Sequence, residues 1–390
     1  MSETDLDRIM QIPGRSTRAI VDLDAITDNV RSIASHLLPD QRVIAVVKAE
    51  GYGHGAVMVG RTALAAGAEM LAVATVGEAA NLRAHQVSAP ILILGPVDPT
   101  ELARATELEC ELSIGSEELL RILLASEHRP AVHLKIDTGM HRYGVAPEDA
   151  VRAAVALDQG GFALRGIMTH FSSADEPDLR PTETQRDLLD AVVARILPEI
   201  AQRPSIHEAN SAGSLRGLPG TFIRLGVAMY GLRPGTGAPL HPDMRPALSV
   251  VSRLARVHVA HPGDGVSYGR TYVEPADERL GLLPIGYADG LHRLLSNRGW
   301  MGVAGAKCPI RGRVCMDQTV IGDIPETAMF GATVGVMGPI GGGPSLDDIA
   351  AWADTINYEV ATSISARVPR YYLSDGQMVA SLIEGMLCEA

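Results

Sequence analysis

The sequence predicts an α/β protein in which a parallel (β/α)8 barrel is followed by a mainly antiparallel β domain. Two features of the chain lead to this prediction. Short apolar segments alternate with amphipathic segments in the first part of the chain, and β-prone runs broken by proline and glycine follow. Eight strands that alternate with helices are typical of a barrel of about 200 residues or more. Short β-prone runs between turn residues are typical of antiparallel sheets.

The first candidate barrel strand, residues 43–47, is short, apolar and rich in β-branched residues, as expected for a strand that is buried on both faces. The candidate strands lie near residues 43–47, 71–76, 91–94, 110–114, 132–136, 164–168, 206–209 and 222–225. Segments between them, such as 54–67 and 186–201, are amphipathic and are expected to be helical. An open doubly wound sheet is the alternative, but no G-x-G-x-x-G motif follows the first strand.

The domain boundary is expected in a segment rich in proline and glycine, RPGTGAPLHPDMRP at residues 233–246. We therefore assign residues 15–245 to the barrel and residues 246–390 to the β domain. A chain of 390 residues is also long for a single domain, which favours a division into two.

Composition argues against several classes of partner. The net charge of −12 disfavours nucleic acid and anionic membranes, because neither attracts an acidic protein. The four cysteines form no C-x-x-C pair and no metal-binding spacing, so we expect no metal and a reduced, cytoplasmic setting. The N-terminal segment MSETDLDRIMQIPGR is acidic and polar, and no apolar run approaches the length of a membrane helix. A soluble protein without a targeting segment is expected.

One lysine stands at the end of the first barrel strand. Lys48 follows the run VIAVV directly and precedes a loop that contains Gly51, Gly53 and Gly55. Glycines allow the backbone to turn tightly and to approach a ligand closely. These residues alone leave two interpretations open. Lys48 is either a lysine whose head reaches water, or an amine whose pKa is lowered by burial so that it forms a Schiff base with a carbonyl compound.

Polar residues lie at or beyond the C-terminal ends of other predicted barrel strands as well. They are Arg142, His170, Asn210, Ser211 and Arg224, with Gly226 close behind. Functional residues of such barrels gather at the C-terminal ends of the strands. A single arginine or histidine at such a position usually has a structural role, but the shared position of these residues favours a site.

These residues lie in motifs that resemble those of alanine racemases, which use pyridoxal phosphate. The motif AVVKAEGYGHG is similar to the segment that carries the cofactor lysine in that family. The likeness continues in the family's order through KIDTGMHRYG, THFSSAD, EANSAG, IRLGVAMYG, GDGVSYGRTY, PIGYADG, GRVCMDQ and INYEV. It covers nearly the whole chain. The opening TRAIVDLDAITDNVRSI resembles the family's N-terminal strand and helix, which implies that a strand within about residues 1–24 joins the β domain.

The resemblance implies a reaction and an assembly. The reaction is the interconversion of L-alanine and D-alanine with pyridoxal 5'-phosphate, which supplies D-alanine for cell-wall peptidoglycan. Inversion requires proton exchange on opposite faces of the substrate carbon, so two bases are needed, and Lys48 and Tyr268 match the family's pair. The family tyrosine reaches the barrel of the other subunit, which implies a homodimer with shared active sites.

The resemblance also implies which residues bind the cofactor. Arg142 matches the residue that meets the cofactor's phenolic oxygen and the substrate carboxylate. Arg224 matches the residue that faces the pyridine nitrogen, and a guanidinium that does not readily give up its proton should leave this nitrogen unprotonated. The histidine that matches His170 contacts both this arginine and the catalytic tyrosine. The implied cofactor-binding residues are Lys48, Tyr52, Arg142, His170, Asn210, Ser211, Arg224, Gly226, Val227 and Tyr358, of which Tyr52, Ser211, Gly226, Val227 and Tyr358 hold the phosphate.

Further positions are implied near the substrate. The substrate-binding residues are Arg142, Cys315, Met316 and Asp317. No histidine and carboxylate pattern supports Cys315 as a nucleophile, and Asp317 equally suits a turn. Lys135 matches a position that is carbamylated in many members and there steadies the arginine that matches Arg142. The residues that match the substrate entryway are Tyr287, Arg293, Arg313 and Ile356.

Two departures from the family pattern leave the breadth of substrates open. Glu50 and Gly51 replace a common Asn-Ala pair, and Tyr143 stands where leucine or phenylalanine is frequent. A racemase of serine or of basic amino acids therefore stays an alternative. A fold-related decarboxylase should lack the SYGRTY context, and a non-catalytic pyridoxal-phosphate carrier would resemble the barrel alone.

Overall fold

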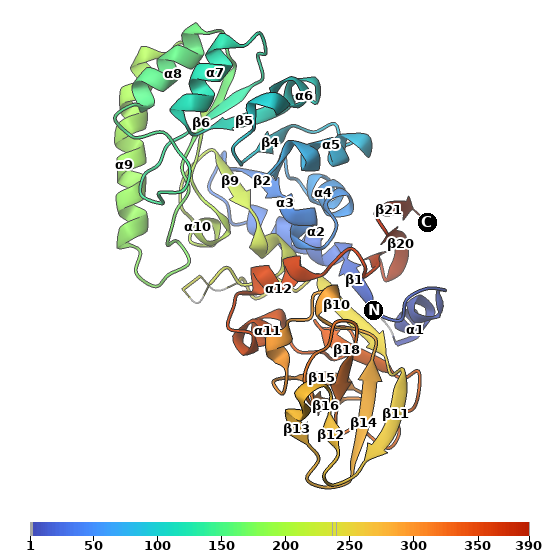
Figure 1. Cartoon of the computed structure of the whole chain (residues 1–390). Coiled ribbons are helices and arrows are strands. Elements are labelled where there is room, and N and C mark those ends of the chain that lie inside the picture. The colour runs from blue at the N-terminus through green and yellow to red at the C-terminus, as the bar shows by residue number, and fades with distance from the viewer. Residues whose placement is uncertain (1–2, 236, 239, 390) are drawn as a thin grey trace. The chain divides into compact units, whose positions relative to one another are not determined.

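The computed structural model describes residues 3–235, 237–238 and 240–389, and the chain divides into two compact units (Figure 1). The barrel unit contains residues 26–51 and 56–244. The β unit contains residues 1–25, 52–55 and 245–390. The short segment 52–55, which follows the first barrel strand in the chain, thus belongs to the β unit.

The barrel unit is built on eight parallel strands in the order β8-β7-β6-β5-β4-β3-β2-β9. The strands are β2 (Arg42–Val46), β3 (Met70–Val73), β4 (Ile91–Ile93), β5 (Cys110–Ile114), β6 (Val132–Lys135), β7 (Leu164–Met168), β8 (Ser205–His207) and β9 (Phe222–Leu225). Two backbone hydrogen bonds, from Thr221 N to Ile206 O (2.6 Å) and from Arg224 N to Ala209 O (2.9 Å), join the two ends of the sheet. The parallel barrel is therefore confirmed.

Helices and short helical turns connect the barrel strands and flank them in Figure 1. They are α2 (Leu23–Ala34), α3 (Lys48–Tyr52), α4 (Ala56–Ala65), α5 (Val76–Ala84), η1 (Pro99–Glu101), α6 (Leu102–Glu107), α7 (Glu117–Ala125), α8 (Ala150–Gln159), α9 (Arg180–Ile196), η2 (Leu197–Glu199), α10 (Ser211–Leu215) and η3 (Val227–Tyr230). The strand predicted at 71–76 was too long, because Thr75 and Glu78 form a capping box that starts α5 at Val76.

The main sheet of the β unit has eight strands in the order β16-β15-β18-β10-β1-β19-β20-β21. They are β1 (Arg18–Asp22), β10 (Leu248–Arg253), β15 (Trp300–Val303), β16 (Ala306–Pro309), β18 (Thr333–Met337), β19 (Arg370–Ser374), β20 (Gln377–Ile383) and β21 (Met386–Glu389). Only β1 and β19 pair in parallel among the described strands of this sheet. The mainly antiparallel character predicted for this part of the chain is confirmed.

Smaller elements complete the β unit. One sheet has three strands, β11 (Arg256–Ala260), β14 (Glu278–Leu283) and β17 (Thr319–Ile321), and a hairpin joins β12 (Gly265–Val266) to β13 (Tyr272–Val273). The helices and turns are α1 (Glu3–Gln11), η4 (Tyr268–Arg270), η5 (Tyr287–Asp289), η6 (Arg293–Leu295), α11 (Leu346–Trp352) and α12 (Asn357–Ser363). Within the described residues, no helix combines the length and the apolar character that crossing a membrane requires.

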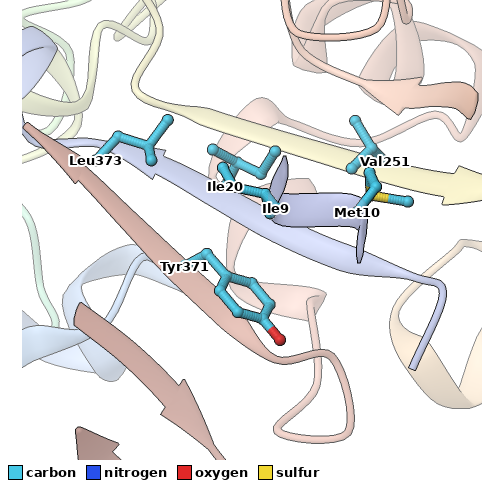
Figure 2. Close-up of a cluster of buried hydrophobic side chains, with 6 residues drawn as sticks. All are labelled: Ile9, Met10, Ile20, Val251, Tyr371 and Leu373. Atoms are coloured by element: carbon cyan, nitrogen blue, oxygen red, sulfur yellow. The ribbon is translucent and has the colours of Figure 1, made fainter. Parts of the chain in front are cut away.

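Helix α1 packs on the main sheet of the β unit (Figure 2). The buried cluster there consists of Ile9, Met10, Ile20, Val251, Tyr371 and Leu373. Arg18 on β1 fixes the end of the helix: its guanidinium donates hydrogen bonds to the carbonyl oxygens of Ile9, Ile12 and Arg15. Arg18 is only 2% exposed and joins three carbonyl groups at and beyond the end of α1, of which that of Ile9 also accepts from Ile12 N (3.2 Å).

Replacing Arg18 with methionine should lower the free energy of unfolding of the β unit by about 2–3 kcal/mol, because the carbonyl oxygens at the end of α1 lose their donor. The two tryptophans of the chain, Trp300 and Trp352, both lie in this unit, so fluorescence during urea unfolding reports on it. The matched control is Arg165→Met, an exposed arginine on β7, which should change stability by less than about 0.5 kcal/mol. Equal stability of wild type and Arg18→Met would contradict the role given to this arginine.

Candidate active site

Lys48 lies at the C-terminal end of β2, where the chain enters an unusual turn. Ala49, Glu50, Gly51 and Tyr52 all have left-handed backbone angles, with φ of 52°, 51°, 59° and 51°. Left-handed conformation costs roughly 1–2 kcal/mol for each residue with a side chain, so the turn needs support. The hydrogen bond from Gly51 N to Val47 O (2.8 Å) closes the turn. Lys48 is thus held in a defined place directly beside a strained segment.

Glu78 anchors the same turn from the neighbouring strand–helix connection. One carboxylate oxygen accepts a hydrogen bond from Ala49 N (2.7 Å), and the other accepts from Ala74 N (2.7 Å) and Thr75 N (3.3 Å). Sequence reasoning missed this residue. The signal that could have found it is the Thr-x-x-Glu pattern of a capping box at residues 75–78.

The amine of Lys48 is partly withdrawn from water, and burial lowers its pKa. The Arg142 guanidinium lowers the pKa further, whereas the Glu78 carboxylate raises it. A lowered pKa increases the fraction of neutral amine, which is the nucleophilic form. Of the two interpretations left open by the sequence, this environment favours the nucleophilic amine.

The glycines after Lys48 serve packing inside the β unit. A side chain on Gly53 would place its Cβ 2.1 Å from the carbonyl oxygen of Ala361 in α12. On Gly55 the Cβ would lie 1.8 Å from the hydroxyl of Tyr372 in β19. The expectation that both glycines admit a ligand was therefore incomplete, because they make room for protein groups.

Tyr52 and Tyr358 are brought together in the β unit, with ring centroids 6.1 Å apart. Burial raises the pKa of Tyr52 to about 12. Its hydroxyl therefore stays protonated at neutral pH and can donate a hydrogen bond to an anion. The two side chains that were expected to share a phosphate thus lie next to each other.

In the barrel unit, Ser211 gathers backbone donors from the chain that follows β9. Its hydroxyl oxygen accepts hydrogen bonds from Gly226 N (2.9 Å) and Ala228 N (3.3 Å). Asn210 caps α10 by accepting a hydrogen bond from Gly213 N (3.0 Å). This contact of Asn210 is structural, because it begins the helix that presents Ser211. Because the oxygen of Ser211 accepts from two backbone N–H groups, the hydrogen of its hydroxyl is left to donate to an anion.

Arg224 is buried at the end of β9 and is surrounded by hydrogen-bond acceptors. Its guanidinium donates to the carbonyl oxygens of Thr169 (2.7 Å), His207 (2.9 Å) and Glu208 (2.9 Å). It also lies 3.0 Å from Nδ1 of His207 and 3.2 Å from Nδ1 of His170. Burial lowers the pKa of Arg224 to about 10, which is less than the usual arginine value, but the residue remains a cation at neutral pH.

Several cations act together at this end of the barrel. Burial holds the pKa of His170 well below its ordinary value, and the charges of Arg224, Arg142, Lys135 and Lys48 lower it further. His170 is therefore neutral, with Arg224 in contact and the other three basic side chains near enough to act on it. Such a concentration of positive charge favours an anionic ligand.

Lys135 is the most perturbed lysine of this group. Its pKa is lowered to about 8, mainly by burial. The charges of Arg224 and Arg142 also lower this pKa, whereas the charge of Asp137 raises it. Its ammonium group donates a hydrogen bond to the carbonyl oxygen of Tyr143. At physiological pH a fraction of this amine is neutral. Arg142 is exposed.

Tyr268 lies in the β unit, in the turn η4 between β12 and β13, and its side chain is 74% exposed. The preceding Ser267 has a φ of 62°, and its hydroxyl donates to Arg313 O (2.7 Å) and lies 3.1 Å from the sulfur of Cys315. Tyr287 joins this group through the hydrogen bond from its N–H to Cys315 O (2.9 Å). The structure thus brings the turn of Tyr268 together with Arg313, Cys315 and Tyr287.

The other residues predicted for the β unit are placed as follows. Met316 and Ile356 are exposed (53% and 59%), and Ile356 directly precedes α12. Arg293 is exposed at the start of η6. Asp317 forms an ion pair with Arg367 (2.7 Å), which is a structural contact that the sequence did not reveal.

Metal binding was not expected from the sequence. Among the residues that the structure describes, no three histidine, cysteine, aspartate or glutamate side chains are grouped so that they could hold a metal ion. The four cysteines are all free thiols.

Two domain profiles of one protein family match the chain. The profile described as "Alanine racemase, N-terminal domain" matches residues 21–234, and "Alanine racemase, C-terminal domain" matches residues 247–372. Together they cover most of the chain.

Relatives and solved structures agree with these matches. Alanine racemase of Geobacillus stearothermophilus is 43% identical over 372 residues, which cover 92% of this chain and 94% of that protein. Alanine racemase 1 of Bacillus subtilis is 38% identical over 374 residues, which cover 94% of this chain and 95% of that protein. The structure of alanine racemase from Bacillus anthracis with bound L-Ala-P is 34% identical with a TM-score of 0.88, and the match covers 96% of this chain and 98% of that one. The chain therefore belongs to the alanine racemase family.

Proposed function

We propose that this chain interconverts L-alanine and D-alanine with pyridoxal 5'-phosphate, and that Lys48 and Tyr268 are the two bases. The observation that carries the proposal is the cationic end of the barrel. There a lysine with a lowered pKa lies at the end of β2, and a buried arginine cation lies on the paired strand β9. The match to alanine racemases over nearly the whole chain supports the assignment of this arrangement to racemisation of alanine.

The residues present fit the groups of the cofactor. Lys48 offers an amine for its aldehyde, and Arg224 offers a cation for its ring nitrogen. The hydroxyl of Ser211 accepts from Gly226 N and Ala228 N, so its own hydrogen is left to donate to the phosphate, and we assign Gly226, Val227, Tyr52 and Tyr358 to the same role. When bound, pyridoxal phosphate supplies a carbonyl that combines with amines and a ring that withdraws electrons from the neighbouring carbon.

The chain's own groups then move the proton. Lys48 exchanges the α-proton of alanine on one face, and Tyr268 exchanges it on the other. A free tyrosine has a pKa near 10, so Tyr268 needs positive charge nearby to act as a base. We assign this positive charge to Arg224, which lies 3.2 Å from Nδ1 of the neutral His170. Arg142 is assigned to the substrate carboxylate, because a planar guanidinium binds carboxylates in a fixed geometry.

We propose that the active unit is a homodimer in which Tyr268 serves the barrel of the other subunit. Exposed large side chains support an interaction surface on the β unit, since soluble proteins usually bury such groups. They are Tyr268 (74%), Tyr287 (43%), Met316 (53%) and Ile356 (59%). Tyr287, Arg293, Arg313 and Ile356 are proposed to line the substrate entryway, and Cys315, Met316 and Asp317 to lie on the substrate side.

We further propose that Lys135 is a carbamate in the active enzyme. A pKa of about 8 leaves part of this amine neutral at physiological pH, which is the form that combines with carbon dioxide. The carbamate anion would oppose the neighbouring charges of Arg142 and Arg224.

Alanine is favoured over larger substrates because both departures from the family pattern are engaged in protein contacts. The Tyr143 hydroxyl donates to Ser113 O (2.8 Å), and its ring packs against Gly115. Glu50 accepts hydrogen bonds from Ala56 N (3.4 Å) and from the Asn81 amide (3.5 Å). Serine and lysine remain the substrates to compare.

The purified protein should convert L-alanine to the racemic mixture, more rapidly than L-serine or L-lysine, as chiral chromatography would show. The chain contains only three lysines, Lys48, Lys135 and Lys307, so borohydride reduction followed by peptide mapping gives a clear answer. The reduced cofactor should be found on Lys48. Lys48→Ala should abolish racemisation, because it removes both the anchor and one base, whereas the exposed control Lys307→Ala should retain it. Reduced cofactor on Lys135 or Lys307 would refute the assignment.

Mixed dimers test whether the site is shared. Lys48→Ala and Tyr268→Phe subunits should each be inactive, but after exchange they should recover up to about a quarter of wild-type activity, because half of the dimers are mixed and each has one intact site. Tyr268→Phe should still bind the cofactor. If mass spectrometry shows mixed dimers and racemisation stays at the level of the parents, Tyr268 does not serve the other subunit.

A further inference from the structure

A chain of buried side chains links Arg224 to a carboxylate on another strand of the barrel. Nη1 of Arg224 lies 3.0 Å from Nδ1 of His207 on β8. Nε2 of His207 lies 2.8 Å from Nδ1 of His133 on β6, and Nε2 of His133 lies 2.5 Å from the carboxylate of Glu111 on β5. His207 and His133 are 0% and 1% exposed, so water does not compete for the hydrogen bonds of His207, whereas the Glu111 side chain is 15% exposed.

The backbone of β7 makes room for this chain. Strand β7 lies between β6 and β8 in the sheet, so a side chain on β7 would block contact between His133 and His207. The residue at that place is Gly166, and a Cβ there would lie 2.2 Å from Nδ1 of His133 and 2.9 Å from Nε2 of His207. Any larger residue would therefore break the contact between the two imidazoles.

The chemistry of the donors fixes every hydrogen in the chain. A guanidinium can only donate, so Nδ1 of His207 must accept from Arg224, and Nε2 of His207 must carry the hydrogen. His207 then donates to Nδ1 of His133, and His133 donates from Nε2 to the carboxylate of Glu111. Burial, the neighbouring imidazole and the charge of Arg224 hold the pKa of His207 well below its ordinary value, which agrees with a neutral ring.

We propose that Glu111 and His133 are positioning residues that act on Arg224 through His207. Arg224 already requires an acceptor at Nδ1 of His207, and His133 stabilises the same tautomer by accepting the hydrogen on Nε2, while Glu111 orients His133 to accept it. If His133 could not accept, the Nε2–H group of His207 would be buried without a partner, which favours moving the hydrogen to Nδ1. The other neutral tautomer would direct an N–H group at the guanidinium, and two donors would face each other. Arg224 would then shift away from the position that it holds among the backbone carbonyl groups.

A purely structural role for the two histidines is the alternative, since buried polar groups are normally hydrogen-bonded. That role predicts a loss of stability when either is replaced, but no change in the tautomer of the other. The positioning role predicts both a tautomer change and a loss of turnover. The effect on turnover rests on the function proposed above, whereas the tautomer is a property of the protein itself.

The test uses full-length protein labelled with 15N-histidine. Nitrogen chemical shifts distinguish protonated from unprotonated ring nitrogens, and the His207 signals are assigned as those that His207→Gln removes. In the wild type, Nδ1 of His207 should be unprotonated and Nε2 protonated. In His133→Leu this pattern should be lost, and kcat should fall by about 10-fold or more, as is usual for partners of a site residue, with a smaller change in KM. The control is His85→Leu. His85 is a half-buried histidine at the C-terminal end of α5 and is not part of this hydrogen-bonded series, so the His207 signals should stay unchanged.

Glu111 provides the second variant, in case His133→Leu does not fold. Glu111→Gln keeps an acceptor oxygen and should retain the tautomer and most of the turnover, whereas Glu111→Leu should lose both. A wild-type His207 that carries its hydrogen on Nδ1, or a Glu111→Leu protein with unchanged signals and unchanged kcat, would overturn the proposal. An inactive wild type with the expected tautomer would instead refute the proposed function and leave the fixed hydrogen-bond chain in place.

Discussion

The buried charge of Arg224 is the constraint on which the functional end of the barrel depends. Placing an ion inside a protein costs several kcal/mol unless its donors are satisfied. The fold meets this requirement with three backbone carbonyl oxygens and two imidazole nitrogens, which come from β7, β8 and the chain beyond them. Burial, supported by this charge, holds the pKa of His170 and His207 well below the ordinary value and lowers that of Lys135. Arg224 thus contributes to the protonation of its neighbours, and its strand β9 pairs with β2, which leads to Lys48.

Much of this architecture could be predicted from the sequence, because barrel strands buried on both faces appear as short apolar runs. All eight strands lie within a few residues of their predicted positions. His170 follows β7 and Ser211 follows β8, as expected, and Arg224 lies within β9 near its end. The motif that contains Lys48 was informative for the same reason: its strand fixes where the amine lies. Roles in binding and catalysis came from the family resemblance, since the residue pattern alone left a lysine with two interpretations.

Other features could not be predicted because they depend on contacts between distant parts of the chain. Nothing local indicates that Gly53 and Gly55 accommodate α12 and β19, or that Gly166 leaves space for two histidines to meet across β7. His133 and Glu111 lie on separate strands, and only the register of the barrel reveals that they connect to Arg224. The left-handed turn after Lys48 was also hidden, because three of its four residues are not glycine.

The central claim is that Arg224 remains a cation and keeps the ring nitrogen of the cofactor unprotonated. Nuclear magnetic resonance of the enzyme loaded with pyridoxal phosphate labelled with 15N in the ring tests it most directly. We expect the shift of an unprotonated pyridine nitrogen at neutral pH, and that of a protonated ring in Arg224→Glu, where a carboxylate stabilises the proton. A protonated ring nitrogen in the wild type would contradict the account.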